Sequence, residues 1–167
     1  LDGRFLHAQE MHLVGRARKG GVGVGIVTPL VMGDGRAVLV DRGWVPADQR
    51  DPVRRQMGNS EGPVVVEGTL RVPPRPGGFT PENQPSRNQW FWLDIPAMAR
   101  HSGLDAAKVL GLVVVAAPAA NPGGLPVGTP TQPELTDNHL QYALTWFALA
   151  LILAVFYGLL VRRARHP

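Results

Sequence analysis

The sequence predicts a mainly β protein: a small antiparallel β barrel or sandwich with one short helix, followed by a C-terminal transmembrane helix. Two observations support this fold class. The 20 glycines and 16 prolines separate short apolar runs along most of the chain, a pattern typical of antiparallel strands joined by turns. The chain then closes with a long uncharged apolar run and a short basic tail. A length of 167 residues suits one such domain and one membrane anchor.

The first half of the predicted domain contains three candidate strands. Residues 12–18 form a weak candidate near the start. Residues 22–31 and 36–45 are expected to pair as a hairpin, because Gly33-Asp34-Gly35 between them is a strong turn signal. This half of the domain is therefore predicted to be built on one hairpin.

Three further strands are predicted downstream. Residues 64–72 follow a Gly-Pro pair and form a clear strand. Residues 89–95 form another, in which Trp90 and Trp92 share one face because strand side chains alternate. Residues 110–117 are mostly valine and fit a strand that is buried on both faces.

One short helix and two irregular stretches complete the predicted domain. The helix is expected to start near Asp94 or Ile95, with Pro96 in its first turn. Residues 73–88 contain five prolines and are predicted to form a stiff surface loop. Residues 118–137 contain five more, too many for a strand or a helix, and are expected to tether the domain to the membrane.

The apolar run near the C-terminus predicts a membrane span. Residues 140–161 carry no formal charge over 22 residues; as a helix they would be about 33 Å long, enough to cross a hydrocarbon core of roughly 30 Å. A buried helix of a soluble protein is the alternative, but few soluble helices run this long without a charge. The predicted parts are an extracytoplasmic β domain (1–117), a Pro-rich tether (118–137), a transmembrane helix (138–161) and a basic cytoplasmic tail (162–167).

The distribution of charge predicts the orientation of the span. The net charge is +4, but residues 1–139 hold 14 basic and 13 acidic residues, and the rest of the excess lies in Arg162, Arg163 and Arg165. The positive-inside rule keeps these arginines cytoplasmic, so residues 1–139 are expected on the outer side. No basic patch of the kind that binds nucleic acid remains, and no nucleic-acid partner is expected. Because an outer domain must be exported, a signal peptide or an N-terminal transmembrane helix is expected before Leu1.

Signals for catalysis and for metal binding are weak throughout the sequence. Cysteine is absent, and none of the three serines lies in a Gly-x-Ser-x-Gly motif. The glycine run at residues 20–25 leads into a predicted strand, whereas a dinucleotide-binding turn leads into a helix. The spacing of the histidines does not match a metal site. Nothing in the sequence marks a hydrolytic or transferase site.

One histidine stands apart from the other four. His139 falls in the first turn of the predicted membrane helix, with Asp137 or Asn138 as its N-cap, and helical spacing places Tyr142 and Trp146 on the same face. An imidazole beside flat aromatic side chains at the membrane interface could be an axial ligand of haem iron. The alternative is an interfacial aromatic belt with a histidine among the headgroups. On these residues alone we favour the belt.

Several separated segments match one family pattern together, although no single one would be convincing. They are Thr28-Pro29-Leu30, residues 38–46, residues 67–71, residues 79–85 with 87–90, Asp94 with Met98-Ala99-Arg100, and residues 138–147 from Asn138-His139-Leu140 to Phe147. Their order and spacing cover nearly the whole chain. In these segments the chain resembles the Surfeit locus protein 1 family of membrane factors for the assembly of cytochrome c oxidase, and it looks like a bacterial member.

The resemblance implies a β-rich domain between two membrane helices and a non-catalytic role. That role is to help haem A reach, or settle in, subunit I of a haem–copper oxidase. Some bacterial members are held to bind haem A through the histidine of the Asn-His-Leu segment, so the resemblance implies His139 as a haem A ligand, beside Tyr142 and Trp146. Residues 133–137 lack the basic lead-in that we expect of the family, which points to a divergent bacterial branch.

The resemblance also implies the partners and the location. Expected partners are oxidase subunit I, other oxidase subunits or assembly factors, and membrane lipid; the expected location is a bacterial plasma membrane, with the β domain on the periplasmic or extracellular side. An accessory subunit that stays bound to the mature oxidase is an alternative, and an enzyme of haem A synthesis is disfavoured.

Two of the matching segments also have a structural interpretation. Residues 42–44 are interpreted as a strand end with a packed Trp44 and a paired Arg42. Residues 79–88 are interpreted as an exposed loop that either contacts the oxidase or is purely structural.

Overall fold

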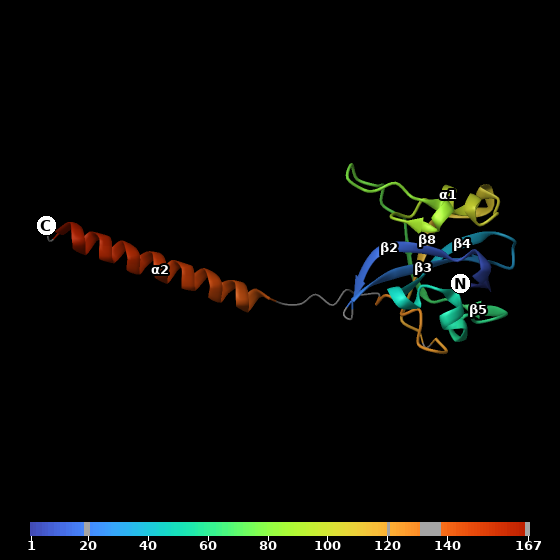
Figure 1. Cartoon of the computed structure of the whole chain (residues 1–167), viewed down its shortest axis with the longest axis horizontal. Helices are drawn as coiled ribbons and strands as arrows, with labels where there is room; N and C mark the ends of the chain where they lie inside the picture. Colours follow the sequence, from blue (N-terminus) through green and yellow to red (C-terminus); the bar gives the residue numbers. More distant parts are fainter. Residues whose placement is uncertain (19–20, 120, 131–137, 166–167) are drawn as a thin grey trace. The chain divides into compact units, whose positions relative to one another are not determined.

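The computed structural model describes residues 1–18, 21–119, 121–130 and 138–165 of the chain. They fall into two compact units, Leu1–Gln132 and Pro133–Pro167 (Figure 1). The first unit is a β domain, and the second contains a single long helix. The predicted fold class, a mainly β domain followed by one apolar C-terminal helix, is confirmed.

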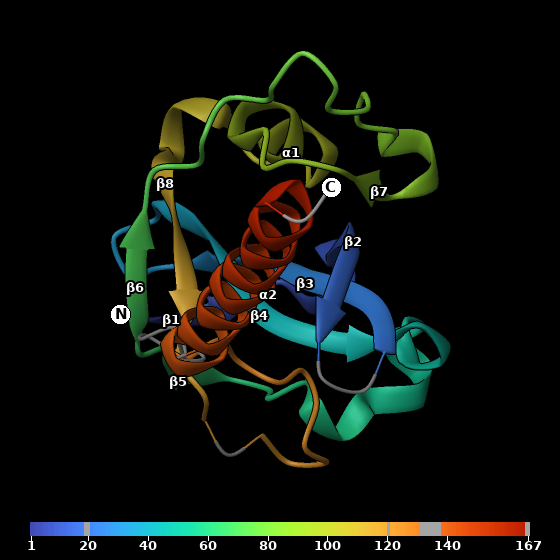
Figure 2. The same cartoon turned by 90° about the vertical axis from the view of Figure 1, so that its left-hand side faces the viewer.

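The described strands of the domain form one curled sheet, which closes into a half barrel (Figure 2). Along the sheet the order is β5-β1-β3-β4-β8-β6, with β2 paired to β3 and β7 paired to β2. Most pairings are antiparallel, as expected, but β4 pairs with β8 and β2 with β7 in parallel. The strands are β1 (Asp2–Phe5), β2 (Met11–Arg18), β3 (Gly21–Val31), β4 (Ala37–Pro46), β5 (Pro63–Val65), β6 (Gly68–Arg71), β7 (Gln89–Trp90) and β8 (Val109–Ala116).

Short helices lie between the strands. The helix α1 forms as predicted, because the Asp94 carboxylate accepts a hydrogen bond from the backbone N–H of Ala97 at 3.1 Å and Pro96 lies in the first turn. It packs over a core that includes Met11, Leu39 and Trp90. The helices of the domain are α1 (Ile95–His101) and the 3-10 helices η1 (His7–Gln9), η2 (Ala47–Gln49), η3 (Pro52–Gly58), η4 (Pro85–Arg87) and η5 (Ala106–Lys108).

The predicted hairpin is confirmed as β3 and β4. Its turn is closed by a hydrogen bond from Gly35 N–H to the Met32 carbonyl at 3.0 Å, and Gly35 has a φ of 79°. The pairing contains one bulge: Ile26 faces Gly43 and Val27 faces Asp41, so the residue between Asp41 and Gly43 has no partner of its own. That extra residue is Arg42, whose side chain turns into the domain.

The prediction of a single strand at residues 64–72 is wrong, because this segment bends and forms the two strands β5 and β6. β5 pairs with β1 and β6 with β8, so this one segment joins the two ends of the sheet. At the bend, Val66 N–H donates to the Leu1 carbonyl at 2.7 Å and Ala117 N–H donates to the Glu67 carbonyl at 2.9 Å. A Cβ on Gly68 would lie 2.2 Å from a β8 carbonyl, so only glycine allows β6 to approach β8 this closely.

The strand predicted at residues 89–95 is much shorter than expected. β7 ends at Trp90, which is fully buried. Trp92 lies outside the strand and is only half-buried. The Asn83 side-chain oxygen accepts hydrogen bonds from the N–H groups of Phe91 (2.7 Å) and Trp92 (3.3 Å). These donors are therefore bonded to a side chain and not to a neighbouring strand. β8 likewise departs from its prediction, since it is buried at its centre but exposed at Gly111.

The first part of the predicted tether belongs to the domain. Trp44 and Val127 exchange two backbone hydrogen bonds of 2.9 Å, and Thr129 N–H donates to the Ala116 carbonyl at 3.0 Å. Gly43 makes this contact possible, because it has a φ of 116° and a Cβ there would lie 2.0 Å from the Val127 carbonyl oxygen. The rest of the tether, residues 131–137, lies outside the described residues.

The second unit contains α2 (His139–Arg165), a helix of 27 residues. Its length and apolar composition are sufficient to cross a membrane. It begins one residue after the predicted start and continues through Arg162, Arg163 and Arg165 in its last turn. The predicted boundary of the basic tail at residue 162 therefore falls within the helix.

Candidate functional site

The residues predicted to contact haem lie in the first two turns of α2. His139 is the first residue of the helix, and the carbonyl of Asn138 accepts a hydrogen bond from Tyr142 N–H at 3.0 Å, as an N-cap residue does. Asp137, the other candidate cap, lies outside the described residues. Spacings of three and four residues place His139, Tyr142 and Trp146 on one side of the helix, where all three are exposed. This face offers one imidazole and two flat aromatic surfaces.

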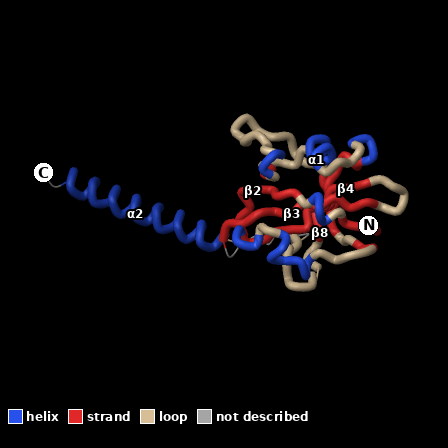
Figure 3. Tube along the Cα trace, turned by 45° about the vertical axis from the view of Figure 1, so that its right-hand side comes forward, coloured by secondary structure: helices blue, strands red, loops and turns tan. Residues whose placement is uncertain are grey.

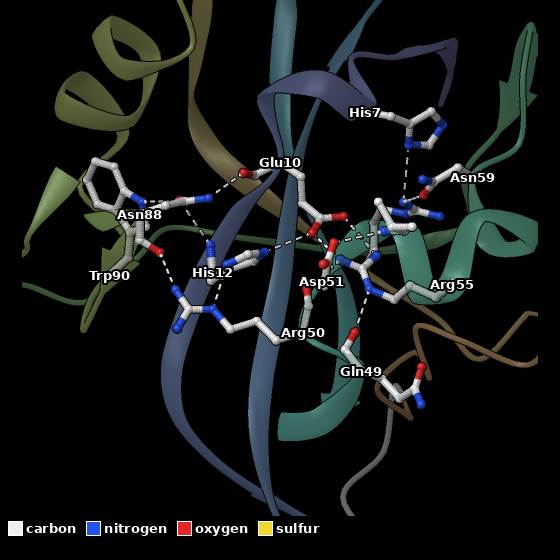
Figure 4. A network of polar contacts seen from close by, with 12 residues as sticks. His7, Glu10, His12, Gln49, Arg50, Asp51, Arg55, Asn59, Asn88 and Trp90 are labelled. Carbon is white, nitrogen blue, oxygen red and sulfur yellow. Dashed lines mark hydrogen bonds and ion pairs between the residues drawn. The ribbon is translucent and has the colours of Figure 1, made fainter. Parts of the chain in front are cut away.

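A second polar cluster, within the β domain, was not expected from the sequence (Figure 4). Its centre is Glu10, which is only 6% exposed and lies just before β2. One carboxylate oxygen accepts a hydrogen bond from Arg55 Nη1 at 2.9 Å; the other contacts Arg55 Nη2 and lies 2.9 Å from His12 Nε2. Arg55 is 5% exposed and sits at a kink within η3. The pair is therefore a buried, bidentate ion pair.

His12 extends this cluster to the loop before β7. Its Nδ1 accepts a hydrogen bond from Arg50 Nε at 2.9 Å, so the network assigns the ring proton to Nε2, which donates to Glu10. Arg50 also donates to the Asn88 carbonyl at 3.3 Å. Asn88 has a left-handed φ of 51°, and its side chain donates to the Glu10 carbonyl at 2.8 Å and accepts from Trp90 Nε1 at 3.2 Å. These bonds connect β2, the end of η2 and β7.

The electrostatics of Glu10 favour a structural role for this cluster. Burial raises the pKa of Glu10, but the hydrogen bonds from His12 and Arg55 and the charge of Arg55 outweigh it, so the pKa lies below its usual value. The carboxylate is therefore ionised at neutral pH, and both of its oxygens are already occupied. A general base needs an oxygen that can reach a substrate proton. The arrangement instead holds three segments of the chain together.

Arg42 forms a neighbouring cluster with a different character. Its guanidinium lies 4.9 Å from the centre of the Phe5 ring, and its Nη1 donates to His7 Nδ1 and to Asn59 Oδ1, each at 3.3 Å. Its Nη2 donates to the Gly58 carbonyl. Burial lowers the pKa of Arg42 to about 10, so the side chain remains charged at neutral pH. The predicted paired arginine is thus paired with neutral groups and an aromatic ring.

Sequence reasoning missed both clusters because their members are far apart in the chain. One local signal was present: Glu10 and His12 are two residues apart at the start of a strand, and such residues share a face. Their partners Arg50 and Arg55 lie in a charged run that resembles an exposed loop. Within the described residues, no group of three or more His, Cys, Asp or Glu side chains could hold a metal ion.

Comparisons with known proteins agree with the resemblance seen in the sequence. The model of the SURF1 family matches residues 1–151. The chain is 35% identical over 174 residues to a SURF1-like protein of Monosiga brevicollis, covering 98% of this chain and 65% of that protein. It is 35% identical over 166 residues to Surfeit locus protein 1 of Homo sapiens, covering 90% and 54%, and 34% identical to that of Mus musculus, covering 89% and 52%.

The chain spans between about half and two thirds of the length of these relatives. Within that length the match runs through the β domain and into α2, since it ends at residue 151. The half-barrel domain, the apolar helix and the similarity over most of the sequence lead to one conclusion. The chain belongs to the SURF1 family.

Proposed function

We propose that the protein is a membrane-anchored assembly factor for haem–copper cytochrome c oxidase, which assists the delivery of haem A to subunit I, or its insertion there, by binding and not by turnover. Family membership supports the assembly role. The observation that carries the haem part is the position of His139 at the start of α2, with Tyr142 and Trp146 on the same side.

The donor chemistry of this face fits haem A as a cargo. An imidazole nitrogen of His139 is a common axial ligand of haem iron, and the rings of Tyr142 and Trp146 are suited to lie against a porphyrin. At a rise of 1.5 Å per residue, Trp146 lies about 10 Å along the helix axis from His139. One face of the haem would thus be held by α2, which leaves the other face for the acceptor subunit.

The proposal includes an orientation. With α2 across the membrane, the arginines of its last turn would be cytoplasmic, and the β domain would lie on the outer side of a plasma membrane. His139 would then lie at the outer interface, where haem and lipid headgroups meet. The partners would be oxidase subunit I, other oxidase subunits or assembly factors, and membrane lipid.

Haem content tests the proposal directly. The full chain is purified in detergent from cells that make haem A, and its haem absorbance is compared between wild type, His139→Ala and Gln141→Ala. Gln141 is a matched control, because it lies in the same turn and helical geometry places it on the opposite side. Loss of haem from His139→Ala alone is expected, with the circular dichroism of the β domain unchanged. Equal haem in all three proteins would refute the site.

Stoichiometry separates this function from its competitors. Transient, substoichiometric recovery with the oxidase is expected for an assembly factor. A constant ratio to mature oxidase would instead favour the accessory subunit, and turnover of haem O would favour an enzyme. Binding without turnover is also supported by the polar cluster of the domain, in which both oxygens of Glu10 and both ring nitrogens of His12 already have partners.

A further inference from the structure

An unusually exposed aromatic side chain lies at the tip of the loop between β6 and β7. Phe79 is as exposed as in an extended peptide, at 104% of the reference area. The loop, residues 73–84, projects from the domain beyond α1 (Figure 3). Single exposed apolar residues are common on protein surfaces, but a fully exposed phenylalanine at a loop tip gives the domain no packing energy. Its presence needs another explanation.

The base of this loop is firmly attached to the domain. Asn83 donates to the Trp92 carbonyl at 3.2 Å, in addition to the two hydrogen bonds that it accepts. Gln84 and Gln89 exchange backbone hydrogen bonds of 2.8 and 3.1 Å. At the tip, Thr80 N–H donates to the Gly77 carbonyl at 3.0 Å, and the Thr80 hydroxyl accepts from Gly77 N–H at 3.0 Å. A loop held at its base and folded into a turn presents Phe79 in a defined place.

This geometry suits an anchor residue in a protein interface. Buried aromatic side chains contribute a large share of the binding energy at such interfaces, and a loop fixed before binding loses little conformational entropy. The loop and its flanking residues carry a net positive charge, since residues 71–87 contain three arginines and one glutamate. A complementary surface would therefore have an apolar socket with carboxylates at its rim.

The loop lies apart from the segment through which the chain leaves the domain. Figures 1 and 2 both show residues 73–84 (green) at the end of the domain that carries α1, and residues 121–130 (orange) at the opposite end. Eight residues, 131–138, separate residue 130 from the start of α2 at His139.

We propose that residues 73–84 form a docking loop that inserts Phe79 into an acidic-rimmed apolar socket on a protein partner of this chain. That the partner is subunit I of the oxidase rests on the function proposed above. The loop acts independently of His139: it holds the partner in place, and it does not contact the haem.

Retention of subunit I by the full chain tests this docking loop. Wild type, Phe79→Ser, Phe79→Leu and Val53→Ser are purified from membranes under identical conditions, and the subunit I that remains bound is measured. Val53 is a matched control, because it is an apolar residue that is 69% exposed elsewhere on the domain, on η3. We expect about tenfold less subunit I with Phe79→Ser, near wild-type amounts with Phe79→Leu, and no change with Val53→Ser.

The possible failures are distinguishable. If Phe79→Ser retains as much subunit I as wild type, the docking loop is refuted and the proposed function stands. If wild type itself retains none, the proposed partner and the docking loop both fail. A photo-crosslinking amino acid at position 79 in intact membranes provides a second readout. Adducts to peptides of subunit I support the inference, whereas adducts to phospholipid alone overturn it.

Discussion

Replacing Glu10 by glutamine should destabilise the β domain far more than any change to an exposed ion pair. The substitution keeps the shape of the side chain but removes its charge, and Arg55 is then left buried without a counter-charge. The new amide group also turns a donor towards either Arg55 or His12, where a carboxylate oxygen now accepts. Removing one partner of a buried ion pair typically costs about 3–5 kcal/mol.

This loss is large against the whole stability of such a domain, which is about 5–15 kcal/mol. Urea unfolding of the full chain in detergent, followed by tryptophan fluorescence, to which buried Trp90 contributes, measures this loss. The urea midpoint is expected to fall by roughly 1–5 M, since small proteins lose about 1–3 kcal/mol of stability per M urea. The matched control is Asp34→Asn, which breaks the exposed pair with Arg36 at 2.7 Å and should leave the midpoint unchanged.

The double variant Glu10→Gln/Arg55→Met completes the cycle. Because it removes both charges, it should be less destabilised than the sum of the two single variants. Our account of the cluster would be refuted if Glu10→Gln were no more harmful than Asp34→Asn. Strict additivity of Glu10 and Arg55 would also contradict it.

Two further predictions follow from groups in the same domain. Burial lowers the pKa of His7, so the unfolded chain takes up a proton at a higher pH than the folded domain. The free energy of unfolding should therefore fall as the pH drops below about 6.5. His7→Gln should flatten that part of the pH profile of stability. A pH profile identical to wild type in His7→Gln would contradict this. Gly43→Ala places a Cβ 2.0 Å from the Val127 carbonyl oxygen at a φ of 116°. It should destabilise the domain by about 1–3 kcal/mol and speed proteolysis near residue 127. The control Gly33→Ala, whose Cβ meets no neighbouring atom, should do neither.

Features encoded by neighbouring residues were predictable from the sequence. The hairpin of β3 and β4 depends on the turn at Gly35, and α1 depends on a cap at Asp94 with a proline beside it. Both signals act within a few residues of the structure that they specify. The same holds for α2, whose apolar run is continuous, and for the common face of His139 and Trp146, which follows from helical spacing. The haem-binding role of this face stays a prediction.

Features that depend on distant contacts were not predictable. The bend between β5 and β6 arises because Gly68 approaches β8, more than 40 residues later in the chain. β7 is short because the side-chain oxygen of Asn83 accepts hydrogen bonds from the backbone N–H groups of Phe91 and Trp92, the two residues after the strand. The ion pair of Glu10 and Arg55 joins residues 45 positions apart. A single sequence carries no periodic signal for contacts of this kind.

The pairing of Trp44 with Val127 has a mechanical consequence. If α2 spans a membrane, any pull on it reaches the domain through residues 127–129, which are hydrogen-bonded to β4 and to the end of β8. β4 is an interior strand, held by β3 on one side and β8 on the other. Such a pull would therefore act first on the interior strands β4 and β8, and not on the edge strands β5 and β6.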